Sequence, residues 1–300
     1  MGVKEVLLVM CALALLFLTI FYFVPMNTLN FGVKTGNYNF SIVQGEGMQQ
    51  FYPNMRFPSS TISYKISNCP LQKQDDMKYA FKLVEEMTPL TFYSVDSGEE
   101  IFVTCEDVDI IQGGFFTAGE GGPTNVTVAG EFNVISHGYI LLIKESNCQK
   151  PNIAMHELFH VLGFGHSTNP ENIMYNISSC DQTVGQDMLQ TINILYSVPS
   201  LPDLIFTDVS ATMSGRFLNL NMTVMNAGLN YASNSTVIIY ADGKVLKEID
   251  LRGLEIGQGL ITSVYNIFVP QLKVQELELI INNDFAEISK DNNRITLEIK

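Results

Sequence analysis

The chain has 300 residues, of which 46% are hydrophobic and only 16% charged, with 17 basic side chains against 31 acidic ones. The resulting formal net charge of −14 at pH 7 argues against a nucleic-acid-binding protein, because phosphates require clusters of Lys and Arg. The length predicts one or two domains, and the hydrophobic content is sufficient for a sizeable core.

The first segment, residues 6–24, is an unbroken apolar run, VLLVMCALALLFLTIFYFV, which Pro25 ends. As a helix, this run would reach about 28 Å, close to the roughly 30 Å of a bilayer's hydrocarbon core. We therefore expect residues 1–25 to form an N-terminal transmembrane helix, a signal anchor in the cell membrane, with the rest of the chain extracytoplasmic. The large residues that end the run disfavour the alternative, a protein secreted after signal cleavage.

The cysteines fit an extracytoplasmic location. Cys11 lies in the apolar run, and the other four cysteines allow two disulfides in three pairings. Their order along the chain favours Cys69–Cys105 and Cys148–Cys180, and the alternative is four free buried thiols. Five N-glycosylation triplets fit the same location, and they begin at Asn39, Asn125, Asn176, Asn221 and Asn234.

Residues 26–55 are rich in Asn, Gly and Gln with little periodicity, and we expect a stalk. From residue 56 the pattern changes. SSTISYKIS, LTFYSV, EIFVTCEDV and YILLIK are typical of strands, DDMKYAFKLVEEM and QDMLQTINILYS of helices, and the Gly-rich GGFFTAGEGGPT of a loop. This order predicts an α+β domain over residues 56–198, with helices laid on a mixed sheet.

Residues 199–300 begin within the proline-containing segment SVPSLP, around Pro199 and Pro202, and have a different pattern. About seven short strands alternate with turn residues, namely DLIFTDVSATM, FLNLNMTVMN, STVIIYAD, KVLKEIDL, LITSVYNIFV, ELELIIN and RITLEI. The pattern predicts an all-β immunoglobulin-like sandwich, and we find no group of catalytic side chains in it.

Three of the four histidines lie in one eleven-residue motif, HELFHVLGFGH. His156 and His160, four residues apart, project from the same face of a helix, so both imidazoles can bind one Zn²⁺. Gly163 can end the helix, because glycine accepts the left-handed conformation, and the chain can then turn back to bring in His166 as a third ligand. Glu157 points off the metal-facing side, toward water in the open fourth position. It is therefore the expected catalytic general base and acid.

The motif HELFHVLGFGHS resembles the zinc-binding consensus of the metzincin metalloproteases, and Ser167 after the third histidine resembles the matrixin branch. The resemblance covers about residues 50–197 and implies a zinc metalloendopeptidase that hydrolyses protein or peptide substrates. Asn-Ile-Met-Tyr resembles the family's methionine turn, so Met174 is implied as a hydrophobic floor and Tyr175 as a packing residue or substrate contact. The family's pattern also implies that the strand before the motif helix pairs with an extended substrate.

The remaining candidate metal ligands are less informative. His137, the fourth histidine, is expected to be a surface or packing residue, because the His-rich loop that binds a second zinc in matrixins is missing. Asp107, Asp109 and Glu120 could hold a calcium ion near the Gly-rich segment, but a solvated acidic loop is the favoured interpretation.

The C-terminal segment resembles the cell-adhesion-related sandwich found beside bacterial and archaeal extracellular enzymes. The resemblance rests on Pro202-Asp-Leu204, Asn226-Ala-Gly228 and the late acidic segment Glu287 to Asn293. A second functional hypothesis is therefore a non-catalytic surface adhesion or envelope-binding protein on a metalloprotease scaffold. A third hypothesis is a cytosolic zinc protein, which would keep its cysteines reduced.

Overall fold

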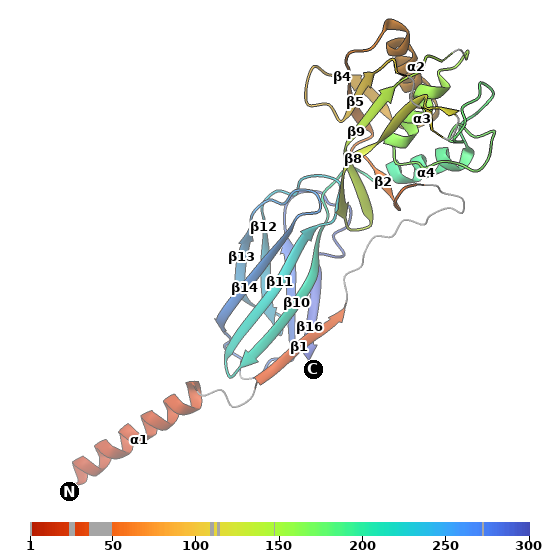
Figure 1. Ribbon diagram of the computed structural model, residues 1–300. Coiled ribbons are helices and arrows are strands. Elements are labelled where there is room, and N and C mark those ends of the chain that lie inside the picture. Colours follow the sequence, from red (N-terminus) through yellow and green to blue (C-terminus); the bar gives the residue numbers. More distant parts are fainter. Residues whose placement is uncertain are drawn as a thin grey trace. The chain divides into compact units, whose positions relative to one another are not determined.

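The computed structural model describes residues 2–23, 28–35, 50–108, 111–112, 115–146, 148–271 and 273–300. It contains two compact units (Figure 1). We call them the α+β unit, which comprises strands β2–β9 and helices α2–α4, and the all-β unit, which comprises strands β1 and β10–β16.

Helix α1 spans Val3–Phe23 and has Lys4 and Glu5 in its first turn. Within the part of the chain that the structure describes, no helix is both long enough and apolar enough to cross a membrane. The expected N-terminal transmembrane helix of residues 1–25 is therefore wrong.

The α+β unit is built on a mixed six-stranded sheet of order β2-β9-β5-β3-β4, in which β8 also pairs with β9. The β8–β9 pair is antiparallel, and the other pairs are parallel. A separate hairpin is formed by β6 (Ile111–Gln112) and β7 (Phe115–Phe116). The strands of the main sheet are β2 (Met55–Arg56), β3 (Thr61–Ile66), β4 (Thr91–Ser94), β5 (Ile101–Cys105), β8 (Gly119–Ala129) and β9 (Phe132–Leu142).

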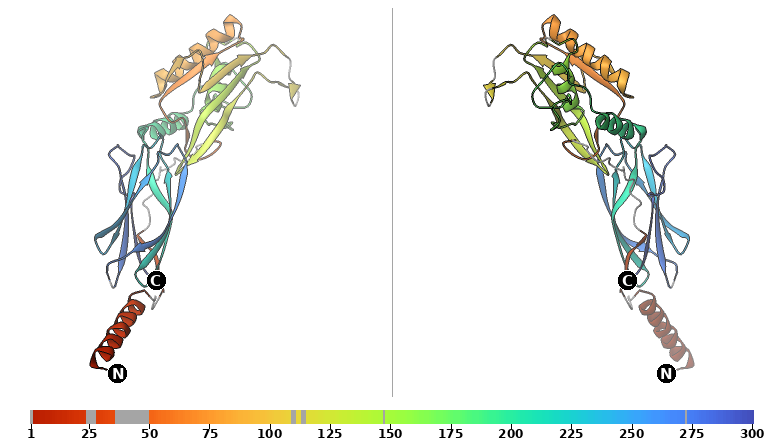
Figure 2. Two further views of the ribbon diagram at one scale, coloured as in Figure 1. Left: turned by 90° about the vertical axis from the view of Figure 1, so that its left-hand side faces the viewer. Right: turned by 90° about the vertical axis from the view of Figure 1, so that its right-hand side faces the viewer.

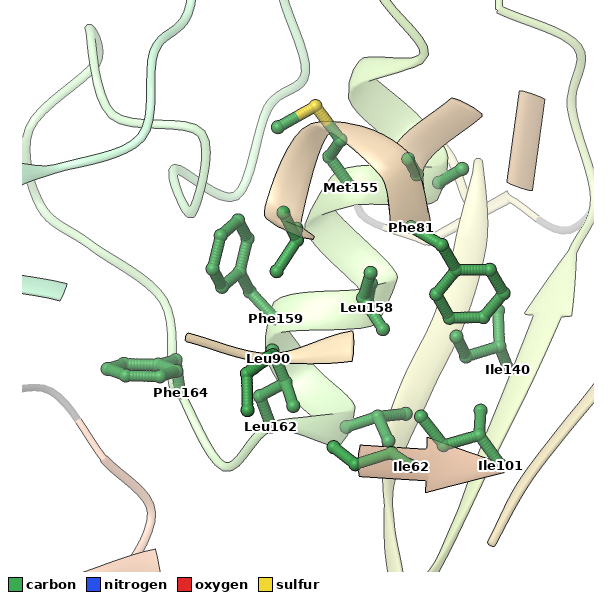
Figure 3. Packing of buried hydrophobic residues seen from close by; sticks show 14 of the residues in the cluster. Ile62, Phe81, Leu90, Ile101, Ile140, Met155, Leu158, Phe159, Leu162 and Phe164 are labelled. Atoms are coloured by element: carbon green, nitrogen blue, oxygen red, sulfur yellow. The ribbon is translucent and has the colours of Figure 1, made fainter. Parts of the chain in front are cut away.

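The helices of this unit are α2 (Leu71–Met87), α3 (Asn152–Val161) and α4 (Gln186–Ser197). Apolar side chains of α3 belong to the same core as those of α2 and the sheet: Leu158 lies toward Phe81 of α2 and Ile140 of β9, and Phe159 lies toward Phe164 (Figure 3). Each fully buried side chain of this size contributes about 1.5–3 kcal/mol. This packing fixes α3, the motif helix, against the sheet, and the predicted α+β architecture is confirmed.

One part of the Gly-rich segment differs from the prediction. We expected a loop, but β8 begins at Gly119 and forms a long hairpin with β9 (Figure 2). The glycines hid the strand because glycine is a poor strand former. They are needed here because β8 passes close to α3, where a Cβ on Gly119 would lie 2.9 Å from the Glu157 carboxylate.

The all-β unit contains all seven strands predicted beyond residue 199. Together with β1 they form one antiparallel eight-stranded sheet of order β13-β12-β15-β16-β1-β10-β11-β14, whose inner face encloses the core. The seven are β10 (Leu204–Ser214), β11 (Phe217–Asn226), β12 (Ser235–Ala241), β13 (Lys244–Leu251), β14 (Gly259–Phe268), β15 (Glu276–Asn282) and β16 (Arg294–Ile299).

The eighth strand of this sheet comes from the segment expected to be a stalk. β1 (Thr28–Thr35) lies between β16 and β10 and pairs with both, and Phe31 is only 4% exposed in the core of the unit. The stalk prediction for residues 26–55 is therefore wrong at β1, while residues 36–49 lie outside the described part of the chain.

Two disulfides join Cys69 to Cys105 and Cys148 to Cys180, the pairing that the order along the chain favoured. The alternative of four free thiols is wrong, and Cys11 is free.

Candidate active site

The motif helix α3 carries His156, Glu157 and His160 and ends at Val161. Gly163 then adopts φ 96°, in the left-handed region, and its N–H donates to the carbonyl of His160 at 3.0 Å. A Cβ at this position would also lie 2.7 Å from the Cβ of Met55. Glycine is therefore required at position 163 for two reasons, its backbone conformation and its contact with β2.

The chain reversal brings three imidazoles together. The potential ligand nitrogens of His156, His160 and His166 all lie within 4.8 Å of one another, and the Nε2 atoms of His160 and His166 are 3.2 Å apart. Two nitrogens bound tetrahedrally to zinc at about 2.0–2.1 Å lie about 3.4 Å apart. The three side chains therefore fit one zinc ion, and they are the one such group of three or more ligands among the described residues.

Backbone carbonyls fix the tautomers of two of these histidines. Nδ1 of His156 is 2.7 Å from the carbonyl oxygen of Ile173, and Nδ1 of His160 is 2.7 Å from that of Phe164. Because a carbonyl oxygen can only accept, each Nδ1 carries the proton. Each Nε2 then presents its lone pair to the shared space, as a metal ligand must.

The two histidines are also held neutral. Burial lowers the pKa of His160 to about 4, and the neighbouring His156 acts in the same direction. Burial likewise lowers the pKa of His156. Near neutral pH both imidazoles are therefore in the deprotonated form that binds metal.

Glu157 lies next to the first of these ligands and is only 5% exposed. Burial raises the pKa of its carboxyl group to about 8, and the charge of Glu120 adds to the effect. A carboxyl group that titrates near neutral pH is suited to taking up a proton and giving it back.

A turn over residues 172–175 supports the histidines. Its Ile173 carbonyl faces His156, and Met174, 1% exposed, belongs to the core of the unit. Asn172 Oδ1 accepts from the Met174 N–H at 2.8 Å, and the Met174 carbonyl accepts from the Ser167 N–H at 2.7 Å. These bonds join the turn to the segment that follows His166.

The histidines open into a cleft of about 880 Å³. Residues 117–121 form one wall, which includes the start of β8, and residues 175–178 form another, beginning with the half-buried Tyr175. Glu145, Ser146 and Cys148, from the loop before α3, complete the lining together with Ile153. The lining of the cleft thus includes the start of strand β8, a cysteine of the Cys148–Cys180 disulfide and the three histidines.

The strand that borders the cleft is β8 and not β9, the strand that directly precedes the motif helix. Among the described residues, β9 has β8 on one side and β2 and β5 on the other, which leaves it no free edge for a substrate, whereas β8 pairs with β9 alone. The expectation that the strand before the motif helix pairs with substrate is therefore wrong.

Sequence analysis also missed two residues before β2. The ring of Phe51 stacks on that of His160 with centroids 5.8 Å apart, and the Phe51 N–H donates to the Gly163 carbonyl at 2.8 Å. Gln50 forms a bridge with Phe164. Both residues fall in the expected stalk, where no periodicity indicated such contacts.

The other candidate ligands do not join the histidine cluster. His137 lies on β9, and its Nδ1 is 2.8 Å from the Thr124 hydroxyl. Asp109 lies outside the described residues, and Asp107 and Glu120 belong to no ligand cluster in the described part of the chain. The structure therefore gives no support for a calcium site.

Comparisons with known proteins agree with this geometry. The Matrixin family (Peptidase_M10) matches residues 56–197, and the CARDB family matches residues 201–297. Mouse stromelysin-1 is 30% identical over 187 residues, which are 53% of this chain but only 37% of stromelysin-1. A crystal structure of the CARDB domain of the PF1109 protein from Pyrococcus furiosus, in complex with di-metal ions, is 14% identical. It covers 33% of this chain and 88% of that one, with a TM-score of 0.28.

The matrixin match contains the histidine motif, and the CARDB match covers most of the all-β unit. Residues 56–197 are therefore a domain of the matrixin family of metalloproteases, and residues 201–297 are a CARDB domain.

Proposed function

We propose that this chain is a zinc-dependent metalloendopeptidase that hydrolyses peptide bonds of extended polypeptides. The observation that carries the proposal is the convergence of the imidazoles beside the buried Glu157. Two Nδ1 protons are committed to backbone carbonyls, so the Nε2 lone pairs remain for a metal. A bound zinc ion would supply a Lewis acid that polarises the scissile carbonyl and lowers the pKa of water.

The protein's own residues supply the rest of the chemistry. His156, His160 and His166 would hold the ion. Glu157, next to the first ligand on α3, takes the proton from the attacking water and delivers it to the leaving amine.

An extended substrate would bind along β8, the edge strand at the cleft wall. An edge strand offers unpaired backbone N–H and C=O groups, to which another strand can add. Pairing at Gly119 and Gly121 would bring the substrate backbone close to Glu157, because both glycines lie against this residue of α3.

We propose that the enzyme acts outside the cytoplasm. The two disulfides, Cys69–Cys105 and Cys148–Cys180, support an oxidising compartment, because such bonds rarely persist in a reducing one. The N-glycosylation triplets in the sequence are compatible with the same location.

Zinc removal tests the proposal. Wild-type protein stripped by a chelator should lose its ability to cleave an unfolded protein, and one equivalent of zinc should restore it. His160→Ala should neither reload zinc nor cleave, whereas the control His137→Ala should behave as wild type. Wild-type protein that binds one zinc per chain but cleaves no unfolded protein would favour the alternative, a non-catalytic adhesion protein.

A further inference from the structure

The segments that build the cleft are almost free of basic side chains. Between residues 83 and 198 the chain has fifteen Asp and Glu but only two Lys and no Arg. The two lysines, Lys144 and Lys150, are not among the residues that line the cleft, whereas Glu120 and Glu145 are. Among the described residues, the cleft is therefore lined by acidic side chains and by no Lys or Arg.

Glu120 lies on the edge strand β8, between Gly119 and Gly121. Those two glycines face α3, so the exposed Glu120 faces the opposite side of the strand. The Glu120 charge adds to the effect of burial in raising the pKa of Glu157, and it adds to the effects of burial and of the Glu106 charge in raising the pKa of Tyr139. Its negative charge therefore acts on the cleft and on the outer face of the sheet.

The loop before α3 carries a second negative group. Glu145 is exposed at the cleft, and the neighbouring Ser146 interacts through its backbone with the carboxylate of Asp76. The Glu145 charge is among the causes that raise the pKa of Asp76, after burial. A substrate that crosses the cleft thus meets carboxylates on two walls.

We infer that the cleft selects cationic peptides, with Lys or Arg preferred at the substrate position that pairs with Glu120. This inference rests on the proposed peptidase function. A substrate residue opposite Glu120 places its side chain on the same face of the extended sheet, where opposite charges stabilise a cross-strand pair and like charges destabilise it. The acidic surface also accelerates the approach of cationic substrates.

A peptide-library digest with the zinc-loaded full chain tests the inference. Wild type should cleave preferentially where Lys or Arg occupies one fixed position relative to the scissile bond. For a matched pair of peptides with Lys or Gln at that position, the kcat/KM ratio should favour Lys by about 2- to 5-fold, as for an exposed ion pair. Raising the salt from roughly 20 mM to roughly 500 mM should reduce the ratio, because the charges are exposed.

Variants at position 120 test whether Glu120 causes the preference for Lys or Arg. Glu120→Gln should abolish the Lys/Gln ratio, and Glu120→Lys should reverse it in favour of a peptide with Glu. The control Glu131→Gln removes the same charge in the β8–β9 turn, outside the cleft, and should leave the ratio unchanged. Cleavage without any Lys or Arg preference, or a profile that Glu120→Lys does not alter, would overturn the inference. Absence of cleavage by wild type would overturn the proposed function itself.

Discussion

The backbone of Gly121 lies directly against that of Glu157, so that a Cβ at position 121 would be 2.9 Å from the Glu157 Cα and closer still to its carbonyl oxygen. Through this contact the edge strand β8 and the motif helix α3 determine each other's position. This contact thus holds the strand edge proposed to bind substrate next to the residue whose carboxylate is proposed to move the proton.

Gly121→Ala should separate β8 from α3. The methyl group would meet backbone atoms that cannot rotate away, so we expect a loss of about 1–3 kcal/mol in the free energy of unfolding and a strong decrease in peptide cleavage. Urea denaturation and kcat/KM measure the two effects.

The next residue on the same strand provides a matched control. A Cβ on Gly122 would meet nothing within 4 Å, so Gly122→Ala should leave both quantities close to wild type. Equal behaviour of the two variants would contradict the proposed role of the contact.

The Cys148–Cys180 disulfide should affect substrate binding. Cys148 lines the cleft, and Cys180 follows the wall formed by residues 175–178, which Asn152 of α3 also holds by donating to the Ser179 carbonyl at 2.7 Å. Replacing both cysteines by Ser should raise KM several-fold with little change in kcat, and should cost about 2–4 kcal/mol of stability.

The other disulfide is the control for this prediction. Cys69–Cys105 closes a loop of similar length, 36 against 32 residues, and neither cysteine lines the cleft. Its double Ser variant should lose similar stability with KM unchanged. If KM rises equally in both variants, the disulfides act on overall stability and not on the cleft wall.

The metal-free protein should become less stable as the pH rises through the titration of Glu157. Its carboxyl pKa is about 8 in the folded chain against an ordinary 4.5, so the stability from the protonated form is fully present below pH 4.5 and is lost toward pH 8. The Glu157→Gln variant lacks this titration. Without metal at about pH 8.5, the variant should therefore unfold at a higher temperature than wild type, with a free energy of unfolding about 2–4 kcal/mol larger. Near pH 4.5 the two proteins should unfold at the same temperature. Parallel stability curves for the two proteins across this pH range would show that Glu157 is not buried as described.

Strand β1 should stabilise the CARDB domain. Phe31→Asp places a charge in the core of the all-β unit, and we expect a loss of at least about 3 kcal/mol in the unfolding of that unit. Val33→Asp, at a position that is 49% exposed on the same strand, should have little effect. Calorimetry should show one lowered transition and an unchanged one for the α+β unit, and lowering of both would argue against separate units.

Much of this fold could be predicted because its signals are local. The spacing of His156 and His160 needs only helix geometry, and the seven strands beyond residue 199 alternate clearly in hydrophobicity. Gly163 could also be predicted as the end of the helix, because glycine accepts the left-handed conformation without help from distant residues.

The features that sequence analysis missed depend on distant partners. β8 contains glycines where α3 lies against it, and β1 is a strand because it pairs with both β10 and β16. Phe51 reaches His160 through a backbone contact with Gly163, which no spacing in the sequence indicates. The apolar run near the N-terminus predicted a transmembrane helix that the structure does not support.

The most direct test of the proposed function is the cleavage rate of Glu157→Ala at full zinc occupancy, measured on an unfolded protein beside wild type. The side chain of Glu157 is not among the three ligands, so the variant should retain one zinc per chain. We predict that its cleavage rate falls by at least about 100-fold, the contribution expected of a general base. Full activity in a zinc-loaded Glu157→Ala variant would contradict the account.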